Sequence, residues 1–219
     1  MYLSRIELNT RRKNTMAALA SPQKLHAAVE CSFPSNTDNA FRNLWRIDQL
    51  GNTLYLLVLS GGKPDFTHIV EQFGWPGAEQ KWETKKYDPL MESIEAGQKW
   101  QFRLRANPVH NVKNDVSSGE QPAKRGKVYA HVTAEQQKQW LFERAAKYGF
   151  VLNEDSFNVV QREVKKFKRQ NNVVTLGIAT FEGILEVKDA ELFRRSLTDG
   201  IGRGKAYGCG LLTVARMSS

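Results

Sequence analysis

The sequence predicts an α+β protein of two tandem ferredoxin-like, RRM-like units, each with the element order βαββαβ. Alternating apolar residues indicate short strands, and apolar residues at helical spacing indicate the helices between them. The same order of elements occurs twice within 219 residues. We expect the first unit at residues 1–90 and the second at residues 96–219, with the halves meeting near Pro89–Gly97.

The first unit begins with an alternating strand at the N-terminus. Ser21 and Pro22 are then typical of a helix N-cap followed by proline at the first helical position. Two strands at 43–48 and 53–60 flank a tight turn, a second helix ends at Gly74, and a strand within 82–87 closes the unit. The residues behind these patterns are Tyr2, Ser4, Ile6 and Leu8 in the first strand, Leu25, Ala28 and Val29 in the first helix, and Phe66, Ile69, Val70 and Phe73 in the second.

The second unit repeats this order. Its first strand alternates apolar Trp100, Phe102 and Leu104 with Gln101, Arg103 and Arg105, which predicts a half-buried strand with one cationic face. The remaining elements are a helix from a capping box at Thr133–Gln136 to Gly149, two long strands at 157–168 and 173–187 around a turn at Arg169–Asn172, a helix capped by Asp189, and a last strand at 211–214. The connection Asn111–Lys127 is expected to be long and mobile.

Composition favours a polyanionic partner. The chain has 32 Lys and Arg against 23 Asp and Glu, a net charge of +9. Nucleic acid is the first choice and an anionic membrane surface the second. No apolar run approaches the roughly 18 residues that span a bilayer, and we expect no signal peptide.

The cysteines and histidines also limit the function. Cys31 and Cys209 are far apart in sequence, which argues against a disulfide scaffold and for a reducing cytoplasm. The four histidines and two cysteines show no zinc-ligand spacing. We therefore expect no metal site and no cofactor.

A glycine-rich run at Gly200–Leu212 carries five glycines and two cations, Arg203 and Lys205. Glycine allows positive φ and close approach of an anion to backbone N–H groups. The run is neither a Walker A loop, because Ala206 follows Lys205, nor a G-x-G-x-x-G motif, because position 207 is tyrosine. The alternative, that these glycines serve packing alone, stays open.

Basic residues gather in four patches of the second half. Any one of them could be a solvated face, but together they suit a surface that follows a nucleic-acid backbone. The predicted RNA contacts are Arg103, Arg105 and Asn107 on the first strand, Lys124, Arg125 and Lys127 in the long connection, Arg162, Lys165, Lys166, Lys168 and Arg169 at the hairpin tip, and Arg203 and Lys205 in the glycine-rich run.

Several of these segments carry a family resemblance. The segment Phe102–Pro108 (FRLRANP), together with Gly200–Leu212, resembles the CasE family, the CRISPR precursor-RNA endoribonucleases of the type I-E Cascade complex. The opening MYLS, Trp140-Leu141 and the segment Phe181–Leu185 fit the same family. The resemblance implies two tandem ferredoxin-like domains and metal-independent cleavage of the CRISPR repeat RNA on the 3′ side of its stem-loop. It also implies that the protein keeps the product as a subunit of Cascade, beside the other subunits.

The resemblance also implies catalytic residues. The family's catalytic histidine corresponds to His26, and such enzymes use the RNA 2′-hydroxyl as nucleophile. The family's helper tyrosine, three residues earlier, is Gln23 here, and an amide cannot transfer a proton. Lys24 or Lys205 could compensate electrostatically. Without the resemblance, His26 is interpreted as a surface residue that pairs with Glu30 one turn later.

Two other functions remain open on the sequence. One is a non-catalytic RNA-binding module of the same fold. The other is an adaptor that binds acidic proteins, which accounts for the basic excess but not for the glycine-rich run.

Overall fold

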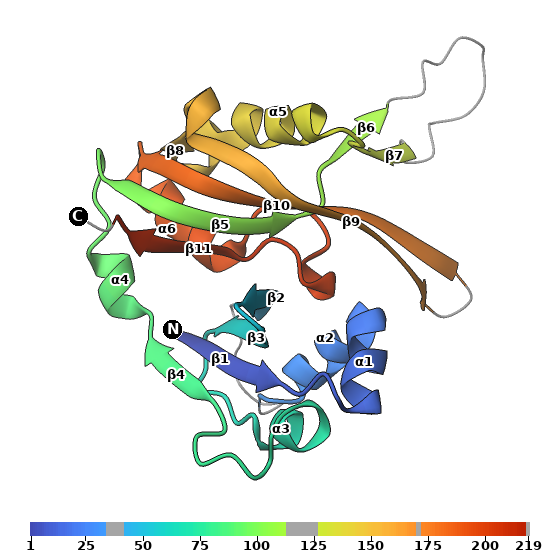
Figure 1. Ribbon diagram of the computed structural model, residues 1–219. Coiled ribbons are helices and arrows are strands. Elements are labelled where there is room, and N and C mark those ends of the chain that lie inside the picture. The colour runs from blue at the N-terminus through green and yellow to red at the C-terminus, as the bar shows by residue number, and fades with distance from the viewer. Residues whose placement is uncertain (34–41, 113–126, 170–171, 218–219) are drawn as a thin grey trace, which may run out of the picture.

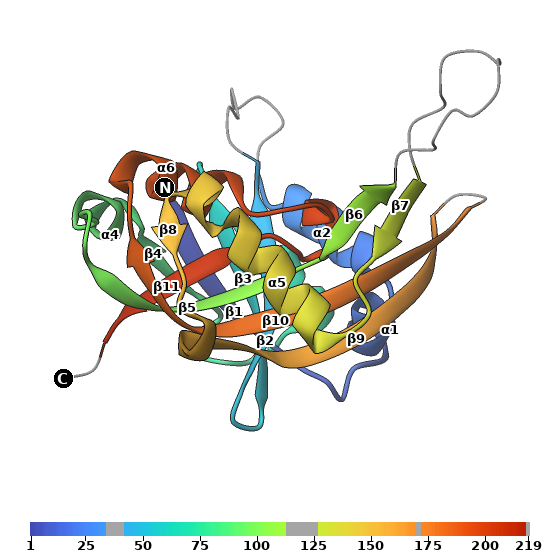
Figure 2. The same cartoon turned by 90° about the horizontal axis from the view of Figure 1, so that it is seen from above.

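The structure is a computed structural model that describes residues 1–33, 42–112, 127–169 and 172–217. Two α/β units are stacked so that their sheets lie between outer layers of helices (Figure 1). Seen from above, helix α5 (Ala134–Ala145) crosses over strands β5 (Lys99–Ala106) and β10 (Asn172–Val187) of the second sheet (Figure 2).

The first unit is a four-stranded antiparallel sheet with the strand order β2-β3-β1-β4. This is the ferredoxin-like order that the sequence predicts. Its elements are β1 (Tyr2–Leu8), α1 (Lys13–Ala20), α2 (Pro22–Glu30), β2 (Leu44–Leu50), β3 (Thr53–Ser60), α3 (Thr67–Phe73) and β4 (Glu83–Lys86). Helix α1 was not predicted, because it buries only Thr15 and Ala18 and so leaves no apolar stripe in the sequence.

The second unit repeats the same topology. Its sheet has the order β11-β5-β10, with β9 and β8 both pairing with β10, so β11-β5-β10-β9 matches β4-β1-β3-β2 of the first unit. The two tandem ferredoxin-like units are therefore confirmed. The other elements are α4 (Asp88–Glu92), β6 (Val109–Val112), β7 (Lys127–Ala130), η1 (Ala146–Tyr148), β8 (Phe150–Val151), η2 (Glu154–Ser156), β9 (Phe157–Arg169), α6 (Ala190–Asp199), η3 (Lys205–Tyr207) and β11 (Leu212–Arg216).

The long connection at 111–127 differs from the prediction at both of its ends. Strands β6 and β7 pair there as an antiparallel ribbon, and Ala130 packs over Gly177 of β10. Residues 113–126 lie outside the described ranges.

Local capping signals explain where several helices begin and end. The capping box of α5 is complete, because the Thr133 hydroxyl accepts from the Gln136 N–H and the Gln136 side chain accepts from the Thr133 N–H, both at 3.2 Å. Asp189 caps α6 by accepting from the Leu192 N–H at 2.9 Å. Ser21 makes no side-chain capping bond, so α2 begins on Pro22 without that contribution.

Strand β2 joins the two units. Trp45 faces the helices of the first unit, whereas Leu44 packs in the core of the second. Next along the strand, Arg46 is 2 % exposed and donates to both carboxylate oxygens of Asp48, at 2.8 and 2.7 Å. It also donates to the carbonyls of Arg103 and Leu211, each at 2.9 Å, so a buried charge crosses the interface. The limits of 1–90 and 96–219 for the two domains stay a prediction.

No helix in the described ranges is long and apolar enough to cross a lipid bilayer.

Candidate active site

Helix α2 presents the predicted catalytic histidine. Leu25 and Val29 are buried against the first sheet and fix the rotation of the helix. A hydrogen bond of 2.9 Å between His68 Nε2 on α3 and the carbonyl of Ala28 holds the helix from the side. The side chain of His26 is consequently only about one-third exposed, at 34 %.

The imidazole of His26 has one buried and one open side. Its Nδ1 atom is buried and has no hydrogen-bond partner among the described residues. Glu30 lies one turn later, with Oε1 3.7 Å from this Nδ1. The pairing that the sequence suggested as the alternative to catalysis is therefore present, at a distance slightly too long for a hydrogen bond.

The other two predicted catalytic residues lie on different faces of α2. Gln23 is exposed and three residues before His26, so the two share one face of the helix. Lys24 is also exposed, but it stands two residues before His26. Two residues rotate about 200° around a helix, so Lys24 and His26 point to nearly opposite sides of α2. The fold therefore brings Gln23 beside His26 and turns Lys24 away.

The glycine-rich run packs directly against α2 through η3. All five of its glycines have positive φ, between 74° and 94°. A Cβ at Gly208 would lie 2.7 Å from the ring of Trp45, and one at Gly202 would lie 3.2 Å from the ring of Trp140. The packing explanation thus holds for these glycines, and the packing of η3 on α2 places Lys205 beside the helix that carries His26.

Lys205 and Arg203 differ in their surroundings. Lys205 is half-buried, and desolvation lowers its pKa, as does the nearby Arg42, while Asp199 opposes the shift. Arg203 is exposed and forms an isolated β-bridge with Asn107. Asn107 is buried, and its Oδ1 has no hydrogen-bond partner within the described ranges.

The β9–β10 hairpin reaches the same place from the second unit, beside α1 and α2 (Figures 1 and 2). Phe167 packs edge-on against Tyr207 of η3, with ring centroids 4.9 Å apart. Lys165 Nζ donates to the carbonyl of Leu19, at the end of α1, over 3.1 Å. Helix α2, the glycine-rich run and the basic hairpin therefore converge, although they are far apart in the sequence.

Strand alternation divides the hairpin cations between two faces. Lys165 is half-buried, and burial lowers its pKa while Glu163 opposes the shift. Lys166 and Lys168 are exposed on the opposite face. Lys165 is thus less accessible than Lys166 and Lys168, because it shares the inner face with Phe167, and its contact with RNA stays a prediction.

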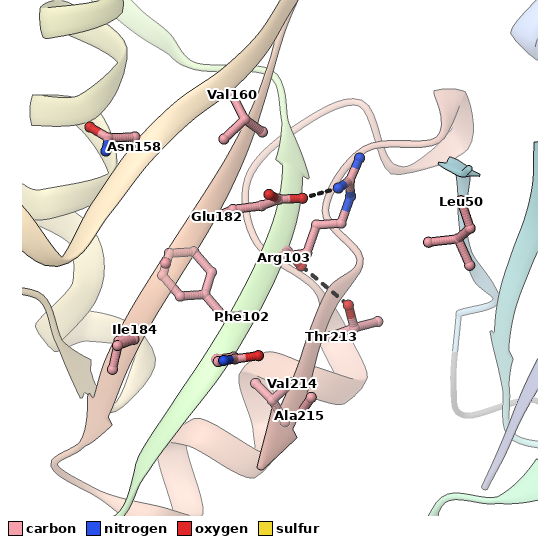
Figure 3. Close-up of a pocket in the computed structure, with 12 residues that line it drawn as sticks. Leu50, Phe102, Arg103, Asn158, Val160, Glu182, Ile184, Thr213, Val214 and Ala215 are labelled. Atoms are coloured by element: carbon pink, nitrogen blue, oxygen red, sulfur yellow. Dashed lines mark hydrogen bonds and ion pairs between the residues drawn. The ribbon is translucent and has the colours of Figure 1, made fainter. Parts of the chain in front are cut away.

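The cationic face predicted on β5 is present, but carboxylates pair with both of its arginines; Figure 3 shows the pair of Arg103 with Glu182. Arg103 pairs with Glu182 and, at 3.1 Å, with Asp48 of the first unit. Arg105 is buried and pairs with Glu163. The two arginines face the neighbouring unit and the hairpin, where carboxylates neutralise them, and their contact with RNA stays a prediction.

A pocket of about 690 Å³ includes Arg103 and is lined by strands β5, β9, β10 and β11 and by Leu50 of β2. Figure 3 shows the side chains that line it. Neither His26 nor a hairpin lysine lines this pocket. It therefore lies apart from His26 and from the tip of the hairpin, although the other ends of β9 and β10 line it.

The remaining predicted RNA contacts have varied positions. Arg162 is exposed and donates to the carbonyl of Val132 at 3.3 Å. Lys127 begins β7 and Arg169 ends β9, but their side chains are not described. Lys124 and Arg125 lie outside the described residues.

Two contacts of the site were missed from the sequence. Lys165 anchors the hairpin on α1, which the alternation of Lys165 with inward Phe167 could have indicated. Asn43, just before β2, donates to Glu30 Oε2 at 3.3 Å. No local sequence pattern predicts the contact between Asn43 and Glu30, because the two residues meet only through the packing of β2 beside α2.

Comparison with known proteins gives full-length matches. The family model for CRISPR associated protein matches residues 1–216. The chain is 29 % identical to the CRISPR-associated endoribonuclease Cse3 of Thermus thermophilus, over 98 % of this chain and all of that protein. It is 28 % identical to the CRISPR system Cascade subunit CasE of Escherichia coli, covering 88 % of this chain and 90 % of that one. The structure of T. thermophilus Cse3 bound to an RNA representing a pre-cleavage complex superposes with a TM-score of 0.80 at 27 % identity, covering 98 % of both chains.

Proposed function

Because the chain belongs to the family of CRISPR-associated proteins, we propose that it is an endoribonuclease that cuts CRISPR repeat RNA on the 3′ side of its stem-loop. The observation that carries the proposal is the convergence of three elements: α2 with His26, the glycine-rich run, and the basic hairpin. A histidine that can transfer a proton, beside a cationic surface that can bind phosphates, suits RNA cleavage by an internal nucleophile.

In this reaction the 2′-hydroxyl oxygen attacks the adjacent phosphorus, and the bond from phosphorus to the 5′ oxygen breaks. The products are a 2′,3′-cyclic phosphate and a 5′-hydroxyl end. One proton leaves the 2′-hydroxyl and one reaches the 5′ oxygen. An imidazole exchanges protons near neutral pH, so we assign His26 to one of these transfers.

Gln23 lies on the same helix face as His26 and is assigned to the phosphate. Its amide N–H donates a hydrogen bond to a phosphate oxygen but transfers no proton. Lys205, half-buried on η3, is the better placed of the two candidate lysines to stabilise the negative charge of the transition state.

Cleavage in excess EDTA tests the proposal. We expect full activity without divalent metal and products that end in 2′,3′-cyclic phosphate. A repeat RNA with a single 2′-deoxy substitution at the cleavage site should stay uncut. Strict dependence on Mg²⁺ would show that cleavage needs a metal ion, and cutting of the deoxy-substituted RNA would show that the 2′-hydroxyl is not the nucleophile.

The two candidate lysines give a paired prediction. Lys205→Met should slow single-turnover cleavage by about 10–100-fold, because a desolvated charge stabilises a developing negative charge more strongly than an exposed one. Lys24→Met, with the same change of charge on the far side of α2, should slow it less than about threefold. A larger loss in Lys24→Met than in Lys205→Met would move the electrostatic role to Lys24.

The hairpin gives a further prediction, on affinity. Replacing Lys166 and Lys168 by alanine should lower the slope of log K against log salt by about 0.7–0.9 for each RNA phosphate that the variant no longer neutralises. Lys165→Ala should change this slope less, because its ammonium already binds the Leu19 carbonyl. A salt titration of hairpin-RNA binding measures both. An unchanged slope in the double variant would mean that these lysines are only a solvated surface.

The proposed partners are the repeat stem-loop and the other Cascade subunits, supported by the 28 % identity to the Cascade subunit CasE. The proposed location is the cytoplasm, where thiols stay reduced. Both cysteines are free in the structure, which supports that compartment.

A further inference from the structure

We propose that Glu30 is a positioning residue for His26. In this role its carboxylate holds the Nδ1–H of the imidazole and so presents Nε2 to the RNA. The inference rests on the proposed function, in which His26 transfers a proton. It adds to the proposed site an acidic residue, Glu30, that lies on the same helix as His26.

The first observation is the state of the imidazole. Nδ1 is buried and has no hydrogen-bond partner within the described ranges, while 34 % of the side chain is exposed. The exposed part of the side chain therefore lies away from Nδ1, and Nε2 is the ring nitrogen that we assign to the RNA. A neutral imidazole carries a proton on only one of its nitrogens, and the partner of one nitrogen sets which one it is.

The second observation is the position of the carboxylate. Glu30 Oε1 lies 3.7 Å from Nδ1, and no other side chain of the described residues is paired with this histidine. Closing this distance to a hydrogen bond takes less than about 1 Å, which a small side-chain rotation supplies. Because the two residues are four apart on one helix, α2 itself keeps them together.

The third observation is that Glu30 is itself held. Its other oxygen, Oε2, accepts from the side-chain amide of Asn43 at 3.3 Å. Asn43 is 5 % exposed and directly precedes β2, so this donor is fixed by the sheet. Oε1 then faces the imidazole. Asn43, Glu30 and His26 therefore form a connected series of side chains that starts at the sheet and ends at Nε2 of the imidazole.

This arrangement matters more here because Gln23 cannot transfer a proton. Of His26 and Gln23, only His26 can transfer a proton. The cleavage rate therefore depends directly on the orientation and the tautomer of this imidazole. A carboxylate that orients a histidine acts through that histidine and does not touch the RNA.

Glu30→Ala tests the role. We expect single-turnover cleavage of bound RNA to slow about tenfold, while the Kd for the repeat RNA stays within about twofold. Glu30→Gln keeps an acceptor oxygen and should lose only about threefold. The matched control is Glu191→Ala, which removes an exposed carboxylate four residues from its partner Arg195 on α6 and should leave the rate unchanged.

A spectroscopic measurement separates positioning from general stability. Long-range ¹H–¹⁵N spectra of the free protein should show His26 as the Nδ1–H tautomer in the wild type, and Glu30→Ala should shift it towards Nε2–H. The same tautomer in both proteins, or a wild-type cleavage rate in Glu30→Ala, would overturn the inference. If His26→Ala is inactive while Glu30→Ala is normal, the proposed function stands and only the role of Glu30 falls. If His26→Ala itself cleaves normally, both fall.

Discussion

Replacing His26 by alanine is expected to slow RNA cleavage by about 10²–10⁴-fold, the usual contribution of a positioned acid or base. The affinity for repeat RNA should stay within a few-fold of the wild type. Proton transfer acts only in the transition state, whereas ground-state binding comes from the basic surfaces. Single-turnover cleavage and equilibrium binding of the same RNA measure the two effects separately.

His110→Ala is the matched control for this substitution. His110 lies on β6 and stacks on Tyr129, in the ribbon of the second unit rather than on α2. Its loss should leave the cleavage rate within about twofold. Near wild-type cutting by His26→Ala would favour the alternative in which this histidine only pairs with Glu30, and the catalytic group would then have to lie elsewhere.

Arg46→Met is expected to lower the free energy of unfolding by about 3–5 kcal/mol, because removing one partner leaves the other charge buried. Arg46 is 2 % exposed and donates to Asp48 and to carbonyls of the second unit. Methionine fills similar space but satisfies none of these acceptors. Burial lowers the pKa of Arg46, and Asp48 counteracts this. The buried guanidinium is therefore stabilised by the Asp48 carboxylate beside it.

Arg5→Met provides the comparison, measured by urea unfolding of both variants. Arg5 pairs with Glu83 at 2.7 Å, but each side chain is 39 % exposed. Exposed pairs contribute about 0–1 kcal/mol. Equal losses in the two variants would show that the buried arginine does not hold the units together.

Local patterns were enough to predict most of the framework. The alternation in β1 and β5 and the helical spacing in α3 indicated the elements, because burial of one face imposes a period of two or 3.6 on the residues. The capping box at Thr133 fixed the start of α5. Helix α1 and the β6–β7 ribbon were missed, because neither buries enough apolar side chains to mark the sequence.

The candidate site was predicted only in part. The sequence and its family resemblance indicated His26, Gln23 and the basic hairpin as candidates. They could not indicate the partners of each charge. Arg103 and Arg105 look like a free cationic face in the sequence, but Asp48, Glu163 and Glu182 come from three other strands.

The sequence by itself determined the two βαββαβ units, the basic excess and the position of the histidine on a short helix. These features depend on the composition of the chain and on the spacing of residues that lie a few positions apart, and both can be read from the sequence. Only the tertiary structure decided which cations are free and which are neutralised, and which elements meet at His26. Lys165 binds the carbonyl of Leu19, and Asn43 binds Glu30, because packing of whole strands and helices brings their atoms within reach. The physical reason is that hydrogen bonds and ion pairs act over a few ångströms in space, whatever the separation along the chain.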